Sequence, residues 1–221
     1  MRTKHIISLA ASFVVVLSII ALNAELKKKV HKKLVVKSAT TDSLKNGDLI
    51  FQTNIKGQGK AIQLATKSKY THIGIVFWVD DEWQVYEATQ PVRMVSLKEF
   101  IEEGDSQKYV IKRHQKSDSI LNSTNVAMMK HYLNEQLGKP YDPFFNWDDE
   151  AIYCSELVYK CYDKIGVKIG ELKPLSSYDL THPIVKSILR QRYGNQIPKN
   201  EKMISPGSMF DSPELIVIKS N

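Results

Sequence analysis

The sequence of 221 residues is 43% hydrophobic and 25% charged, which excludes a disordered or low-complexity chain and allows a domain with its own core. The sequence has 31 Lys and Arg and 24 Asp and Glu. Residues 1–37 contain eight of the basic residues and one of the acidic residues, so the net charge of +7 belongs to this segment and the remainder is neutral. A neutral folded part excludes a basic groove along a phosphate backbone, and we expect no nucleic-acid partner.

The N-terminal segment has the pattern of an export signal. Residues 6–22 contain nothing more polar than Ser, and Arg2 and Lys4 precede them. The run is slightly shorter than the roughly 20 residues of a spanning helix, and a cut after Ala24 leaves a large residue at the −3 position. Residues 1–24 are therefore either a cleaved signal peptide or a membrane anchor. Both predict an exported protein in the periplasm or at the cell surface, and an anchor would hold it at the membrane.

A basic linker is expected to follow at residues 25–43, with the cluster Lys27–Lys33 as a solvated tether. Positive residues prefer the cytoplasmic side of a membrane, which leaves an inward-facing domain as the alternative to export. Residues 44–221 are expected to form one folded domain.

In chain order, alternating apolar residues predict strands and helical spacing predicts helices. The expected strands are residues 48–52, 71–79, 83–89, 92–95, 108–113 and 214–219. The expected helices are residues 59–68, 97–102 behind a capping box, 123–137, 154–165, 176–180 and 183–189. A polar loop precedes the last strand. Strands gather in the middle and helices towards the ends, which indicates an α+β fold with a mostly antiparallel sheet.

Cys154 is suited to chemistry because it lies where an aromatic-rich loop becomes a helix. Free N–H groups and the helix dipole favour a thiolate there, and such sites lower a cysteine pKa from about 8.5 to roughly 3.5–7.5. The alternative is a buried, inert thiol on the apolar stripe. Cys161 lies mid-helix, about 10.5 Å along the axis from Cys154, which is too far for a disulfide.

His72 and Glu87 are the candidates to act with this thiol. If Trp78 pairs with Trp83 across a turn, Glu87 falls opposite Gly74 on the face that holds His72. The two side chains are then diagonal neighbours, and the missing side chain of Gly74 leaves the carboxylate room to reach the imidazole. A tighter turn would move Glu87 away. His72 would then be a packing residue and Glu87 a solvated one.

Several other kinds of site are excluded by what the sequence lacks. No two histidines or cysteines show metal-ligand spacing, so we expect no metal. Neither a phosphate-binding glycine loop nor a nucleophilic-serine elbow is present, and we expect no cofactor.

Three segments in this order resemble the YiiX-like hydrolases: Tyr70–Val76, Glu87–Val92 and Tyr153–Val158. These hydrolases are circularly permuted, papain-like relatives of NlpC-type cell-wall peptidases and of lecithin retinol acyltransferase. The permutation is visible because the histidine precedes the cysteine. The similarity covers roughly residues 44–180. It implies a circularly permuted papain-like fold of the NlpC type, with an antiparallel sheet packed against helices.

The resemblance implies that Cys154 is the nucleophile, His72 the general base and Glu87 the residue that orients the imidazole. Tyr141 is similar to a tyrosine that lines the site of the cell-wall peptidases. Gln90 is the next candidate for substrate contact or for the orienting role.

The implied function is a cysteine-dependent hydrolase that cleaves amide bonds through an acyl-enzyme, in cell-wall peptides if the domain is exported. One alternative is a lipid-directed acyl hydrolase or acyltransferase at the membrane, acting on a lipid amide. Another is a binding module without activity. The oligomeric state stays open.

Overall fold

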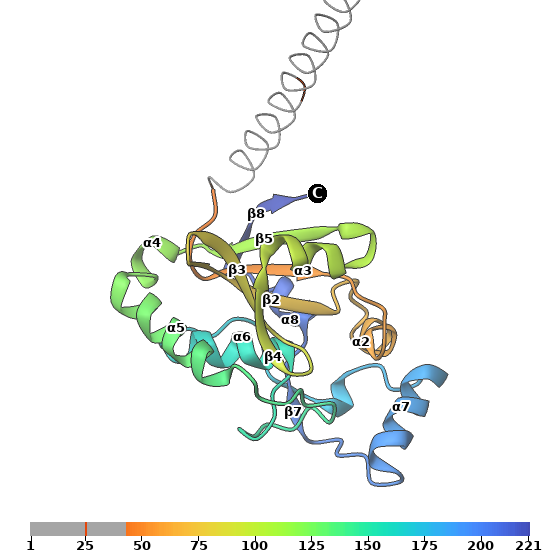
Figure 1. Ribbon diagram of the computed structural model, residues 1–221. Coiled ribbons are helices and arrows are strands. Elements are labelled where there is room, and N and C mark those ends of the chain that lie inside the picture. The colour runs from red at the N-terminus through yellow and green to blue at the C-terminus, as the bar shows by residue number, and fades with distance from the viewer. Residues whose placement is uncertain (1–24, 26–42) are drawn as a thin grey trace, which may run out of the picture. The chain divides into compact units, whose positions relative to one another are not determined.

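Six antiparallel strands form the central sheet, in the order β4-β3-β2-β1-β5-β8 (Figure 1). The structure is a computed structural model that describes Glu25 and residues 43–221, and the sheet belongs to the compact unit Lys45–Asn221. The strands lie close to their expected bounds. They are β1 (Asp48–Gln52), β2 (His72–Val79), β3 (Glu82–Ala88), β4 (Val92–Ser96), β5 (Tyr109–His114) and β8 (Leu215–Ser220).

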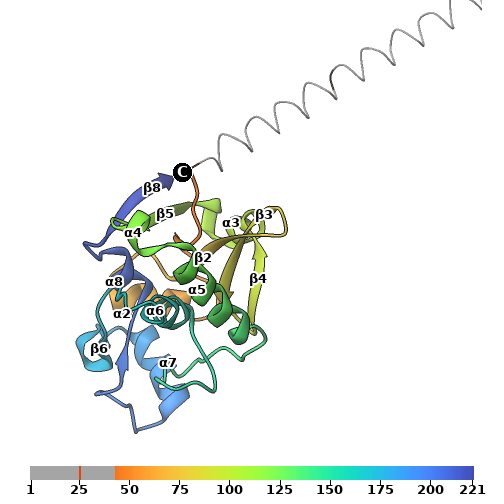
Figure 2. The same cartoon turned by 90° about the vertical axis from the view of Figure 1, so that its left-hand side faces the viewer.

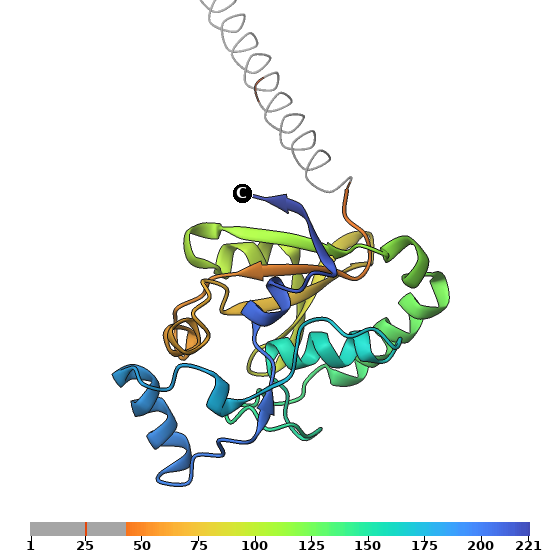
Figure 3. The same ribbon diagram turned by 180° about the vertical axis from the view of Figure 1, so that it is seen from behind.

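Helices pack against this sheet and against one another. The α-helices are α2 (Gly59–Thr66), α3 (Leu97–Glu103), α4 (Ser117–Ile120), α5 (Ser123–Gln136), α6 (Cys154–Asp163), α7 (Pro183–Tyr193) and α8 (Pro206–Phe210). Short 3₁₀ turns lie at η1 (Asp105–Gln107) and η2 (Leu175–Ser177). Figure 2 shows α5 and α6 side by side, and Figure 3 shows α2 next to α7. The predicted α+β class is confirmed.

The turn between β2 and β3 sets the register on which the candidate site depends. Asp80 and Asp81 form it with φ angles of 48° and 61°, a left-handed conformation that aspartate tolerates and that suits a two-residue hairpin. Trp78 pairs with Trp83, as predicted. Continuing that register places Glu87 opposite Gly74.

The two faces of the sheet meet different helices because side chains alternate along each strand. Ile73, Ile75 and Phe77 of β2 share one core cluster with Leu157 and Val158 of α6. The alternate positions of β2 lie on the opposite face of the sheet. This second face turns towards α3, which packs on β3 and β4.

Gly74 lets α3 approach this second face closely. A Cβ atom at Gly74 would lie 2.3 Å from Cγ1 of Val85 and 3.1 Å from Cε2 of Phe100. The space that Gly74 leaves is therefore filled by Val85 and Phe100. Our expectation that a glycine here also lets the Glu87 carboxylate reach the imidazole stays a prediction.

The predicted polar loop before the last strand contains two short elements. Strand β7 (Lys202–Met203) pairs with β6 (Lys173–Pro174), and α8 follows. Ser205 caps α8, because its Oγ accepts a hydrogen bond from the Ser208 N–H at 3.1 Å. Elements this short carry no periodicity, which is why the sequence predicted a loop.

Helix α7 also runs beyond its expected end, and the helix expected at 176–180 is the 3₁₀ turn η2.

The predicted signal or anchor at residues 1–24, and most of the predicted linker at 25–43, lie outside the described residues. Among the residues that the structure describes, no helix combines the length and the apolar composition needed to cross a membrane.

Candidate active site

Cys154 is the first residue of α6, and its side chain is buried at 3% exposure. Neighbouring side chains tie this end of the helix to the segment before α8. The Tyr153 hydroxyl accepts a hydrogen bond from the Ile204 N–H at 3.2 Å, and the Ser155 hydroxyl donates one to the Ile204 carbonyl at 3.0 Å. The thiol therefore starts from a fixed backbone at the positive end of a helix dipole.

His72 lies at the start of β2 and links the thiol to a carboxylate. Its imidazole interacts with the Cys154 thiol, and its Nε2 lies 2.5 Å from Oε2 of Glu87. Because Nε2 is engaged by Glu87, Nδ1 is the nitrogen left for the thiol. The ring stacks on Phe100 with a centroid distance of 5.4 Å and an interplanar angle of 20°. Both the position and the tilt of the imidazole are thus defined.

Glu87 is fully buried and uses both carboxylate oxygens. Oε2 contacts His72, while Oε1 accepts a hydrogen bond from Nε of Arg93 at 2.9 Å. Burial opposes ionisation, but the hydrogen bond and charge of His72, together with Arg93, outweigh it and lower the pKa of Glu87. The carboxylate is therefore ionised at neutral pH.

The same contacts act on the imidazole in the opposite direction. Burial opposes the charged form of His72, yet the hydrogen bonds and charges of Cys154 and Glu87 prevail and raise its pKa to about 10. His72 is therefore a cation at neutral pH. The structure thus brings together Cys154, His72 and Glu87, the three residues that the sequence singled out.

An apolar cavity of about 80 Å³ opens beside Cys154. Ala61 and Ile62 of α2 line one part of it, and Val185 and Leu189 of α7 line another. Nothing in the sequence predicted this cavity, because its walls come from helices at opposite ends of the domain.

Tyr141 and Gln90 have different positions relative to this cavity. Tyr141 lines it, and its hydroxyl accepts a hydrogen bond from Nε2 of Gln58 at 2.5 Å. Gln90 is exposed, and its Oε1 accepts a hydrogen bond from the Tyr141 N–H at 2.7 Å. Gln90 thus supports the backbone of the Tyr141 loop, whereas the contact to His72 is made by Glu87.

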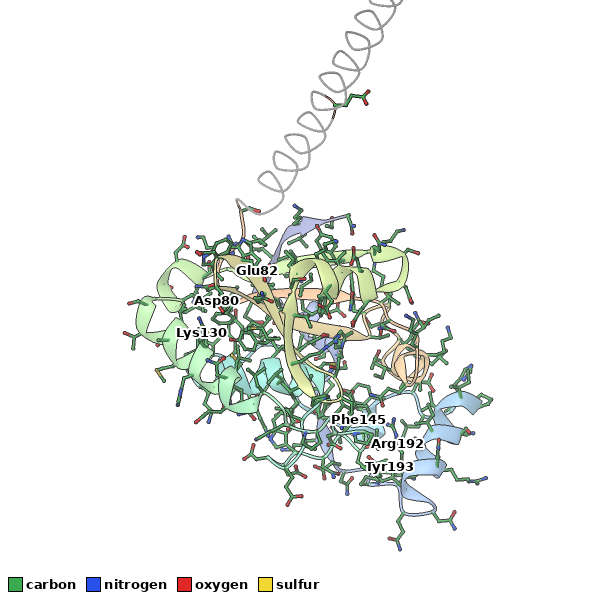
Figure 4. All side chains as sticks on the ribbon, in the orientation of Figure 1. Asp80, Glu82, Lys130, Phe145, Arg192 and Tyr193 are labelled. Carbon is green, nitrogen blue, oxygen red and sulfur yellow. The ribbon has the colours of Figure 1, made fainter. Side chains whose placement is uncertain are left out.

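Arg192 is a cavity residue that sequence reasoning missed. Its guanidinium donates a hydrogen bond to Oε1 of Gln58 and lies over the ring of Phe145, 5.3 Å from the centroid (Figure 4). Burial lowers its pKa. No local signal could have found it, because Gln58 and Arg192 are 134 positions apart.

Cys161 has none of these features. It is fully buried, its Sγ lies 3.9 Å from the Met129 carbonyl oxygen, and burial raises the pKa of its thiol far above the usual range. Both cysteines are free thiols. Cys161 is therefore a core residue.

Comparisons with known proteins bear on the family and the fold of this chain. A model of the family described as permuted papain-like amidase enzyme, YaeF/YiiX, C92 family, matches residues 43–219. The uncharacterized protein YiiX of Escherichia coli strain K12 is 40% identical over 174 residues, which are 78% of this chain and 84% of that protein. A crystal structure described as the metalloprotein YiiX of Escherichia coli O157:H7 is 38% identical and has a TM-score of 0.76, covering 81% of this chain and 98% of that one. The predicted permuted papain-like fold is confirmed.

That YiiX structure is described as a metalloprotein, which raises the question of whether side chains of this chain could bind a metal ion. Among the residues described here, no three His, Cys, Asp or Glu side chains are grouped so as to hold a metal ion. The nitrogen and oxygen atoms of His72 and Glu87 that face each other are already paired, and Arg93 takes the other carboxylate oxygen. These residues do not fit a resident metal.

Proposed function

The chain belongs to the permuted papain-like amidase family of YaeF and YiiX, and from this premise we propose that it is a cysteine hydrolase of amide bonds. Cys154 is the nucleophile, His72 the acid and base, and Glu87 the carboxylate that orients the imidazole. The observation that carries the proposal is the position of His72, whose imidazole interacts with the Cys154 thiol and lies 2.5 Å from a buried carboxylate.

The reaction follows from these positions. The Cys154 thiolate attacks the amide carbonyl carbon and forms an S–C bond, while the backbone N–H at the start of α6 stabilises the oxyanion. The imidazolium of His72 gives its proton to the leaving nitrogen as the C–N bond breaks. A water molecule then attacks the thioester, with His72 accepting a proton from it. The S–C bond breaks, the carboxylic acid leaves, and the thiolate–imidazolium pair is restored.

The substrate class is a second question, with two candidates. Cell-wall peptides are amides, and relatives of the fold cleave them. The apolar cavity beside Cys154 favours the other candidate, an amide that carries an apolar acyl chain. A polar peptide would leave the walls formed by Ala61, Ile62, Val185 and Leu189 without an apolar partner, whereas an acyl chain would bury them.

A substrate screen on the purified full-length chain in detergent tests both parts of the proposal. We expect hydrolysis of N-acyl amides with long chains, slower hydrolysis of short-chain analogues, and no turnover by Cys154→Ala. Cleavage of cell-wall muropeptides without cleavage of N-acyl amides would overturn the substrate assignment. If neither class is cleaved and a thiol-reactive probe leaves Cys154 unlabelled, the protein is a binding module and the proposed activity is wrong.

A further inference from the structure

We propose that Arg93 is a positioning residue for the reaction, acting through Glu87 on the imidazole of His72. This inference rests on the proposed function for its catalytic consequence, but the geometry behind it stands by itself. Arg93 lies on β4 directly opposite Glu87 of β3, and His72 lies on β2 beyond Glu87. The three side chains form a chain of contacts across adjacent strands.

The contacts fix the orientation of the Glu87 carboxylate. Arg93 approaches Oε1 twice, with Nε at 2.9 Å and Nη2 at 2.8 Å, while Oε2 lies 2.5 Å from Nε2 of His72. A rotation of the carboxylate that loosened one contact would loosen the other. Planar guanidinium donors are well suited to hold a carboxylate in one orientation, which an ammonium group does less well.

Helix α3 holds Arg93 in turn. Nη2 of Arg93 lies 2.6 Å from Oε2 of Glu103, and Nη1 lies 3.6 Å from Oε1 of Glu99. The same helix places Phe100 on the ring of His72. One helix therefore supports both ends of the chain of contacts, the imidazole at one end and the guanidinium at the other.

The charges alternate along this chain of contacts, from the imidazolium through Glu87 and Arg93 to Glu103. Glu87 has no exposure, so it depends on its two cationic neighbours to stay ionised. Without Arg93, Oε1 would be a buried acceptor without a donor and the carboxylate would protonate more readily. A neutral or rotated Glu87 would hold the imidazolium less well.

A second arginine–carboxylate pair in the same sheet provides a matched control. Arg113 donates from Nε to Oδ1 of Asp48 at 2.7 Å and from Nη2 to Oδ2 at 2.7 Å, and Asp48 is also fully buried. Asp48 lies at the opposite end of β1 from Gln52, the residue that pairs with His72. Loss of this pair removes a comparable contact from the sheet without touching the site.

The experiment compares Arg93→Gln, Arg93→Lys and Arg113→Gln with the wild-type full-length chain. The first readout is the proton NMR signal of the short His72–Glu87 hydrogen bond, which should lie far downfield and disappear in Glu87→Gln. The second is kcat and KM for a long-chain N-acyl amide, and the third is the thermal midpoint. We expect Arg93→Gln to lose the downfield signal and to lower kcat by about 10- to 100-fold, with KM nearly unchanged. The magnitude is taken by analogy with residues that hydrogen-bond to and orient metal-binding histidines.

Arg93→Lys, which keeps the charge, should recover part of the loss, and Arg113→Gln should lower the thermal midpoint while keeping kcat and the signal. A folded Arg93→Gln with wild-type signal and kcat would overturn the proposal, as would equal losses of kcat in Arg93→Gln and Arg113→Gln. If wild type cleaves no amide but the signal vanishes in Arg93→Gln and persists in Arg113→Gln, the proposed function fails and the positioning role stands.

Discussion

The imidazole of His72 and the carboxylate of Glu87 are joined by a 2.5 Å contact between Nε2 and Oε2, although 15 positions separate them in the chain. The contact depends on the register of the β2–β3 hairpin, which the turn at Asp80 and Asp81 sets. A slip of one residue would carry Glu87 to the other face of the sheet. The turn, far from the thiol, is thus part of what builds the site.

We expect Cys154→Ala to lower turnover by at least about 10³-fold and Cys161→Ala to leave it nearly intact, because Cys154 interacts with His72 whereas Cys161 is a buried core residue. Iodoacetamide labelling followed by mass spectrometry checks the same distinction in wild type. Equal labelling of the two thiols in the folded protein would contradict it.

Glu87→Gln should keep the fold because the side chains are nearly isosteric. The amide supplies no charge to the imidazolium, so turnover should fall by about 10²-fold or more. Thermal melting and steady-state kinetics of the purified variant test this. Asp81→Asn at the hairpin turn is the control, since asparagine also accepts the left-handed conformation there, and it should keep wild-type turnover. A normally melting Glu87→Gln with wild-type turnover would show that Glu87 has no orienting role.

His72 should titrate near pH 10, well above its ordinary value of 6.5, because Cys154 and Glu87 stabilise the cation against the cost of burial. Since the folded pKa lies above the unfolded one, these contacts stabilise the fold fully below pH 6.5, and their contribution is lost as pH rises through about 10. NMR titration of the ring measures the pKa directly. The difference in thermal midpoint between wild type and His72→Gln should shrink between these two pH values. A wild-type ring that titrates near 6.5 would exclude the ion pair.

Filling the cavity should impair long-chain substrates selectively. Ala61→Phe places a ring between α2 and α7, where each displaced methylene group is worth about 0.8 kcal/mol, so KM for a long-chain N-acyl amide should rise about tenfold or more. Iodoacetamide, which needs no acyl pocket, should react with Cys154 at the wild-type rate. Lys60→Phe, on the exposed side of the same helix, should leave KM unchanged. An unchanged KM in a folded Ala61→Phe would remove the cavity from the substrate site.

Much of the candidate site was predictable because its signals are local. The loop-to-helix boundary before Cys154 follows from apolar spacing. The position of His72 and Glu87 as diagonal neighbours on adjacent strands follows from the pairing of Trp78 with Trp83. The close approach of α3 to Gly74 was not predicted, because Phe100, one of the side chains nearest to that glycine, comes from a separate element. Strand periodicity reports which face a residue lies on and does not report which helix covers that face.

The sequence alone determined the strands, the main helices and the neutral folded part, and it singled out Cys154 over Cys161 as the candidate nucleophile. These properties depend on composition and on neighbours a few positions away, which a periodic pattern reports. The tertiary structure alone decided that the first residue of α6 lies near the start of β2 and that Arg93 links Glu87 to Glu103. It alone also decided that α2 and α7 line an apolar cavity. Such contacts join segments far apart in the chain. Their geometry is set by how the whole core packs, because a close-packed interior fixes side chains only once all its layers are in place.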